Sequence, residues 1–254
     1  MSVLLYEWRR ISTLRSTWIL SGLALGQAVL ILLLPLLLSV EFYQSTSTSL
    51  NDLIPITIVP IFIIFMSTIA GAAFGHDYRH GTIRTSLSLF PNRLELLFGR
   101  VTLVLLFTTF VYAMTVFALI FTVWAWSTAT GGFDWTTFAP AFIRALLYMT
   151  IYNLGVLAIV MLTRIQALGI VVPLMMTLAV EGIVTLILSS RYPWISDYMP
   201  YSQGINWAIG SMYESTSDYT SITSVFTSIP LPFLGFNVTL FLIAIWLFHR
   251  RDAS

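Results

Sequence analysis

Six long apolar stretches run through this chain of 254 residues, separated by short polar segments. A helix needs about 20 apolar residues to cross the hydrocarbon core of a bilayer, whereas a spanning strand needs about half that number. The stretches therefore predict an all-α integral membrane protein with six spanning helices in one domain, residues 1–254. The predicted spans cover residues 17–40, 53–75, 101–125, 137–163, 167–189 and 226–248.

The composition agrees with this class, because 57% of the residues are hydrophobic and only 9% are charged. The mean hydropathy is +0.88. The first stretch is too long for the apolar region of a secretory signal, and five more spans follow it. We therefore expect it to remain as a helix.

The arginines set the expected orientation, because basic residues in short loops stay on the cytoplasmic side. Ten of the twelve arginines fall on one side of the six-span arrangement, and Arg191 is the only basic residue in the opposite loops. Both termini are therefore expected in the cytoplasm. A basic set made only of arginine is typical of a GC-rich bacterial genome, so we expect a bacterial plasma membrane.

Two absent residue types exclude several classes of function. Without Cys the chain has no thiolate nucleophile and no cysteine-held metal or iron–sulfur site. Without Lys it has no Walker A phosphate loop and no Schiff-base lysine. The three histidines, His76, His80 and His249, lie at the predicted cytoplasmic boundary. We therefore expect no catalytic residue, no metal site and no cofactor bound by this chain, and no nucleic-acid partner.

The polar segment 76–100 holds four arginines between the second and third predicted spans. Ile83, Leu87 and Phe90 follow helical spacing, which predicts a short amphipathic helix with Arg84 and Ser88 on its other side. A Pro-Asn turn follows that helix, and Arg93 and Arg100 are expected near the lipid headgroups. Such a helix suits docking into a groove of a soluble partner, while the plainer alternative is a basic loop that only sets topology.

The first fifteen residues are too short and too charged to cross a bilayer. Leu4, Trp8 and Ile11 share one helical face, with Arg9 opposite, so we expect an amphipathic elbow helix along the inner leaflet. An ordinary basic flank that only sets topology is the alternative.

The segment between the second and third spans also resembles a known family. Asp77-x-x-x-Gly81-Thr82, followed by Pro91-Asn92-Arg93, is similar to the motif between spans two and three of the type-2 ABC-exporter permeases. Many members have Glu at the position of Asp77 and a smaller residue at that of Asn92. Glu7-x-x-Arg10, the six-span order and the long outer segment extend the resemblance over nearly the whole chain.

The resemblance implies a permease subunit of an ATP-driven exporter with no ATPase domain of its own. Two permease subunits, identical or related, would form the pathway in the lipid bilayer on separate ABC ATPase subunits that hold ATP and Mg. Residues 76–100 would contain the coupling helix, and re-entrant helices between spans five and six would cover the outer end. The residues assigned to ATPase coupling are Asp77, Arg79, Gly81, Thr82, Ile83, Arg84, Leu87, Phe90, Pro91 and Arg93, and those of the elbow are Glu7, Trp8 and Arg10.

The outer segment 190–225 is rich in Tyr and Trp, which favour the membrane interface. Pro193 and Pro200 exclude one continuous helix, so we expect short helices that dip into the outer leaflet. Two interpretations stay open: an aromatic belt without a gating role, and the re-entrant lid that the resemblance implies.

Glu181 is an ionisable residue at membrane depth, where such groups are costly and tend to be paired or functional. Arg144 in the fourth predicted span lies at a similar depth, and a very short turn near Arg164 joins the two spans. An ion pair between Glu181 and Arg144 is one interpretation. A Glu181 that faces the pathway and contacts cargo or a proton is another.

Two glycine pairs, Gly22-x-x-x-Gly26 and Gly71-x-x-x-Gly75, predict a close approach of spans one and two. For the whole chain, the expected function is export of an amphipathic drug, peptide or lipid. The alternatives are an ATP-independent secondary transporter that uses Glu181, and a non-transporting membrane scaffold or sensor subunit.

Overall fold

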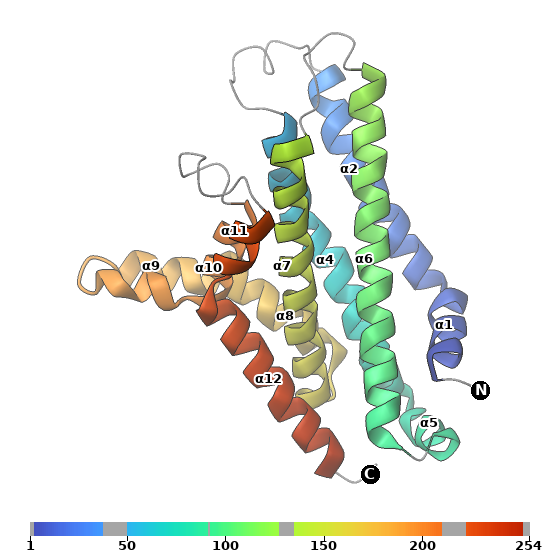
Figure 1. The fold of residues 1–254 in the computed structure, drawn as a ribbon. Coiled ribbons are helices and arrows are strands. Elements are labelled where there is room, and N and C mark those ends of the chain that lie inside the picture. The colour runs from blue at the N-terminus through green and yellow to red at the C-terminus, as the bar shows by residue number, and fades with distance from the viewer. Residues whose placement is uncertain (1–2, 38–49, 91, 127–134, 210–221, 251–254) are drawn as a thin grey trace.

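The computed structural model describes residues 3–37, 50–90, 92–126, 135–209 and 222–250. Over these ranges the regular structure is entirely helical, without a β-strand (Figure 1). This confirms the predicted all-α class.

The helices follow the predicted order of apolar stretches. The first half contains α1 (Val3–Thr13), α2 (Arg15–Leu37), α4 (Leu50–His80), α5 (Ile83–Leu89), α6 (Arg93–Trp126) and α7 (Trp135–Thr163). The second half contains α8 (Gln166–Met175), a π-helix (Met176–Val180), α9 (Glu181–Leu188), a 3₁₀-helix (Pro193–Tyr198), α10 (Pro200–Ile209), α11 (Ile222–Thr227) and α12 (Leu231–Arg250).

Each predicted span overlaps a helix of the described ranges, although the sixth begins in α11 and continues in α12, and four segments of these ranges are long and apolar enough to cross a membrane. These four are Arg93–Ala118, Phe138–Thr163, Gln166–Leu188 and Leu231–Arg250. The chain therefore has the build of a membrane protein. The number of spans and the side on which each terminus lies remain predictions.

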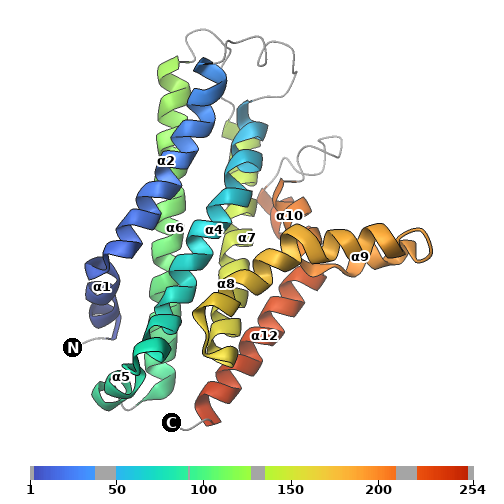
Figure 2. The ribbon, with the colours of Figure 1, turned by 180° about the vertical axis from the view of Figure 1, so that it is seen from behind.

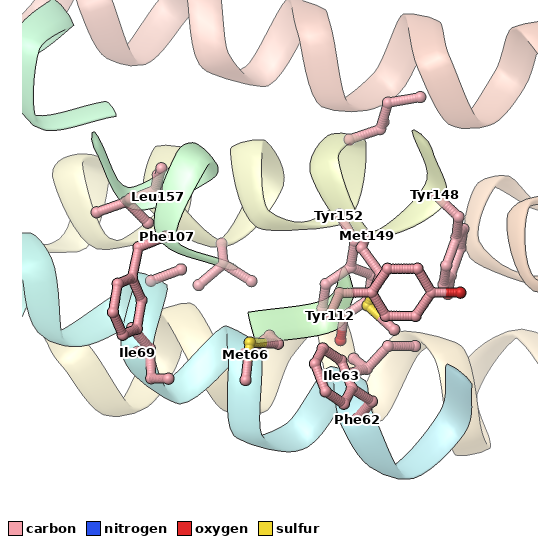
Figure 3. Close-up of a cluster of buried hydrophobic side chains, with 14 of the residues drawn as sticks. Phe62, Ile63, Met66, Ile69, Phe107, Tyr112, Tyr148, Met149, Tyr152 and Leu157 are labelled. Carbon is pink, nitrogen blue, oxygen red and sulfur yellow. The ribbon is translucent and has the colours of Figure 1, made fainter. Parts of the chain in front are cut away.

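The core lies where α4, α6 and α7 meet, and α7 is the central helix. Of the apolar window of α7, 72% is buried, and this helix packs extensively against α4 and α12. Figure 3 shows the cluster: Phe62 and Met66 come from α4, Tyr112 from α6, and Met149 and Tyr152 from α7. Tyr112 packs edge-on to Phe62, with ring centroids 5.4 Å apart. Aromatic and Met side chains thus fill the space between the three helices.

The fifth predicted span is not one straight helix beside the fourth. It starts after a turn in which Arg164 has a positive φ of 61°, and α8 packs back on α7, as expected. A π-helix then interrupts it, and Figures 1 and 2 both show α9 running away from the bundle, across the direction of α7. Pro173 lies one turn before this break and lacks the N–H that a regular helix would use.

The first and second predicted spans, α2 and α4, pack against each other as expected, but the glycines named for this contact do not form it. A Cβ at Gly71 would meet Ile170 at 3.0 Å, and one at Gly75 would collide with Gln166, so both glycines allow α4 to approach α8. A Cβ at Gly22 or at Gly26 would have no atom of another part of the protein within 4 Å. The spacing indicated a close helix contact, but it carried no information about which helix supplies the other side.

Candidate functional site

The polar segment between the second and third predicted spans is mostly helical. The helix α4 continues to His80 and α6 begins at Arg93. The connection between them is therefore short, and α5 forms most of it. Gly81 turns the chain with a positive φ of 67°, a conformation that suits glycine and strains other residues. The Thr82 hydroxyl donates a hydrogen bond to the Asp77 carboxylate, 3.0 Å away, and this bond ties the turn to the end of α4.

The carboxylate of Asp77 joins three helices. Its Oδ1 lies 3.0 Å from Nη2 of Arg10 on α1, and its Oδ2 lies 2.7 Å from Nη1 of Arg100 on α6. Asp77 is only 3% exposed. The elbow helix and the two helices that flank α5 therefore meet at one buried acid.

Glu7 closes the set into a ring of four charges. It accepts a hydrogen bond from Arg10 at 3.0 Å, and two from Arg100, from Nε at 3.0 Å and from Nη2 at 2.6 Å. Glu7 is 1% exposed and Arg100 is 0% exposed. Glu7, Arg10, Asp77 and Arg100 are called the charge tetrad below; the charges of two acids and two arginines cancel.

Further contacts fix the tetrad in place. Arg10 also donates to the Ala73 carbonyl at 2.7 Å, and the guanidinium of Arg100 lies 4.9 Å from the ring centre of Phe74. Burial and the charge of Arg100 lower the pKa of Arg10, while the carboxylates of Glu7 and Asp77 oppose this shift. A buried ion network adds little net stability compared with apolar residues, but removal of one member strands a charge. The tetrad therefore holds α1, α4 and α6 in one mutual position.

Arg100 corrects the sequence prediction. It was expected near the lipid headgroups, whereas it lies inside the protein with Glu7 and Asp77. The charge balance explains the difference, because Arg10 alone leaves the two buried acids with an excess negative charge. The flanking residues Leu96, Leu97 and Gly99 suit a headgroup arginine equally well, so no signal in the sequence separates the two positions.

The other predicted coupling residues lie around α5. Arg79 is exposed, Ile83 is half-buried, and the half-buried Phe90 has its ring centre 5.4 Å from that of Tyr6 on α1. Arg93 is the first residue of α6. Pro91 and the side chains of Arg84 and Leu87 lie outside the described residues.

The apolar face that spacing predicts on α1 is divided, because Ile11 packs against the protein while Leu4 and Trp8 are exposed. Ile11 is buried, together with Val3 and Glu7, while Leu4 and Trp8 are 46% and 48% exposed. The acid Glu7 faces the protein because its partners Arg10 and Arg100 are there. Leu4 and Trp8 remain available to the inner leaflet, as expected of an elbow helix.

Glu181 has a partner that neither interpretation of the sequence named. Its Oε1 accepts a hydrogen bond from the backbone N–H of Tyr201 at 3.0 Å, and its Oε2 accepts one from that of Ser202 at 2.5 Å. Arg144 is 2% exposed on α7 and is not among these contacts. The sequence argument compared only the depths of Glu181 and Arg144 in their two spans. It could not show that α10, about twenty residues further along the chain, supplies the partners of Glu181.

The outer segment forms short helices, as expected, and its aromatic residues divide into two groups. Tyr192, Trp194 and Tyr198, on and beside the 3₁₀-helix, are exposed, whereas Tyr201 and Trp207 on α10 are buried. Tyr213 and Tyr219 lie outside the described residues. One segment thus holds an exposed aromatic group and a helix that packs on the bundle, while the aromatic belt and the lid stay predictions.

No protein-family model matches the chain, and no curated protein matches it. Within the ranges that the structure describes, no three His, Asp or Glu side chains gather as a candidate metal site. The arginines predict which end of the bundle is cytoplasmic. The charge tetrad is a buried cluster of charged side chains at that end, and we take it as the candidate site.

Proposed function

We propose that this chain is the permease subunit of an ATP-driven exporter of the ABC-2 type, coupled to a separate ATPase through α5. Two such subunits form the translocation pathway, and the ATPase subunits bind ATP and Mg. The cargo class that fits the apolar and aromatic helices is an amphipathic drug, peptide or lipid.

The observation that carries this proposal is the burial of the charge tetrad beside α5. The ATPase can move membrane helices only through a contact that does not yield, because a flexible loop would absorb the displacement. Asp77 and Arg100 stand at the two ends of the α4–α5–α6 connection, and they pair with each other and with α1. A push on α5 would therefore move α1, α4 and α6 together.

The position of α5 adds a second line of support. Figures 1 and 2 show α1, α5, the turn between α7 and α8, and the end of α12 at one end of the bundle. This is the end that the arginines predict to be cytoplasmic. Soluble ATPase subunits would meet α5 there.

The test is affinity purification of the tagged chain from its native membranes, followed by ATP hydrolysis measurements on the reconstituted complex. We expect an ABC ATPase in the complex. Ser88→Pro should break α5, because proline costs about 3 kcal/mol inside a helix. Ser88 is exposed, so Ser88→Ala serves as the matched control that keeps the helix.

The variants distinguish the proposal from its alternatives. Two results together support the proposal. The chain binds an ATPase, and the permease changes the rate of ATP hydrolysis in the Ser88→Ala complex but not in the Ser88→Pro complex. A stably folded chain that binds no ATPase would contradict it. That result would favour an ATP-independent transporter or a scaffold subunit.

A further inference from the structure

The first turn of α10 lies inside the protein, where its backbone donors need partners. Tyr201 and Gly204 of this helix are buried, and the ring of Phe233 on α12 packs where a Gly204 side chain would lie. The N–H groups of a first helical turn have no partner within the helix, and burying one without a partner costs several kcal/mol in an apolar medium. A helix can begin at such a place only if the surroundings supply acceptors.

Every donor of this turn has an assigned acceptor. Pro200 has no N–H, the Tyr201 and Ser202 N–H groups donate to the two oxygens of Glu181, and the Gln203 N–H donates to the Met199 carbonyl at 3.0 Å. The negative carboxylate also complements the positive end of the helix dipole. Glu181 is 3% exposed, so water does not replace it.

The surface of α7 that α10 covers contains polar groups, and keeping them from water destabilises the docked position of α10. The Asn153 amide nitrogen is buried on α7 without a hydrogen-bond partner, and the buried Tyr148 and Tyr152 hydroxyls share a single neighbouring hydroxyl, that of Thr177. A polar group without a partner costs about 1–3 kcal/mol when it is kept from water. Tyr201 of α10 packs on Tyr152 with ring centroids 5.7 Å apart, so α10 helps to keep this face dry.

We propose that Glu181 is a positioning residue that latches α10 as a movable lid over the phenol face of α7. The carboxylate stabilises the docked position, and the polar groups that gain water on opening favour the undocked one. The π-helix Met176–Val180 ends directly before Glu181, and π-helices are frequent at functional sites. The role of this lid in export rests on the proposed function, whereas the latch itself does not.

The test uses the absence of native cysteine in this chain. Ala208 on α10 is 2% exposed, so a cysteine introduced there reports undocking through its reaction with a water-soluble maleimide. The full-length chain is labelled in open native membranes, with Glu181 intact and with Glu181→Gln or Glu181→Ala. Tyr198→Cys, at a position 67% exposed, reports full access, and Ala145→Cys, at a position 0% exposed on α7, reports global unfolding.

We expect Glu181→Ala to raise the labelling rate of the Ala208→Cys site by about tenfold or more, since two hydrogen bonds to a charged group are lost. Glu181→Gln keeps one acceptor oxygen and should give an intermediate rate. The Ala145→Cys site should stay protected in all backgrounds.

Two outcomes would overturn the proposal: equal labelling of the Ala208→Cys site with and without Glu181, or simultaneous exposure of the Ala145→Cys site. The second would make Glu181 a residue of general stability. No ATPase is needed in this assay, so failure of the latch and failure of the exporter proposal are separate results.

Discussion

At the residue scale, Arg100 is the position on which the charge tetrad depends most. It contacts both Glu7 and Asp77 and is fully buried, so Arg100→Met leaves two buried acids with only Arg10. We expect a loss of stability of about 3–5 kcal/mol, seen as a lower unfolding midpoint of the purified protein in detergent. Arg79→Met removes an exposed arginine of the same segment and should change little. Equal effects of the two substitutions would show that the tetrad does not act as a buried unit.

His76 predicts a dependence of stability on pH. Burial lowers its pKa below the ordinary value of 6.5, with help from the charges of His80 and Arg10, while Asp77 opposes this. The unfolded chain then binds a proton more readily than the folded one, so stability is complete above about pH 6.5 and falls on acidification. His76→Gln should weaken the dependence of the unfolding midpoint on pH between pH 7 and 5.5. His249→Gln, at an exposed position on α12, should leave this dependence unchanged. An unchanged slope in the His76 variant would contradict this assignment.

The residues of the tetrad show how far the sequence led. Glu7, Arg10 and Asp77 stood in motifs that the resemblance singled out, and the structure brings all three together. Arg100 stood in none, because a buried arginine and a headgroup arginine share the same flanking pattern. Glu181 was recognisable as costly, but its partners are backbone N–H groups, which any residue supplies.

At the element scale, hydrophobic length predicted where the helices lie but not how they are directed. Apolar length reflects the need to bury backbone and side chains, so it located α2, α4, α6, α7, α8–α9 and α12. The crosswise course of α9 depends on the π-helix, on Pro173 and on contacts with α10, which are local or long-range features without a periodic signal.

The close contact between α4 and α8 predicts a sensitive position. The Cβ of any larger residue at Gly75 would collide with Gln166 at the start of α8. Gly75→Val should therefore separate the two helices and destabilise the protein by about 1–3 kcal/mol through overpacking. Gly26→Val, where no atom lies within 4 Å, is the matched control for the loss of a spanning-helix glycine. The measurement is the unfolding midpoint of each purified variant in detergent. An equal fall of this midpoint in both variants would argue against the contact between α4 and α8.

At the scale of the whole molecule, the proposed function and the proposed latch assign different tasks to two parts of the structure. One end holds the charge tetrad beside α5, where the proposed coupling would require a stiff contact. The other part holds α10, whose first turn donates to the Glu181 carboxylate and whose side chains Tyr201 and Trp207 also bond to Asn237 and Ser228. In the proposed exporter, movement enters at α5 and the outer lid responds, with α7 between them as the central helix.

The most direct test of this account is a photo-crosslinking measurement at Ser88 on α5. A photoreactive amino acid placed at Ser88 in native membranes should form an adduct with an ABC ATPase, identified by mass spectrometry. The same group at Thr102, exposed on α6 beyond the tetrad, should form none. An ATPase adduct at Ser88 alone is the predicted result. A folded, membrane-inserted protein without an ATPase adduct at Ser88 would contradict the claim that α5 couples this chain to an ATPase.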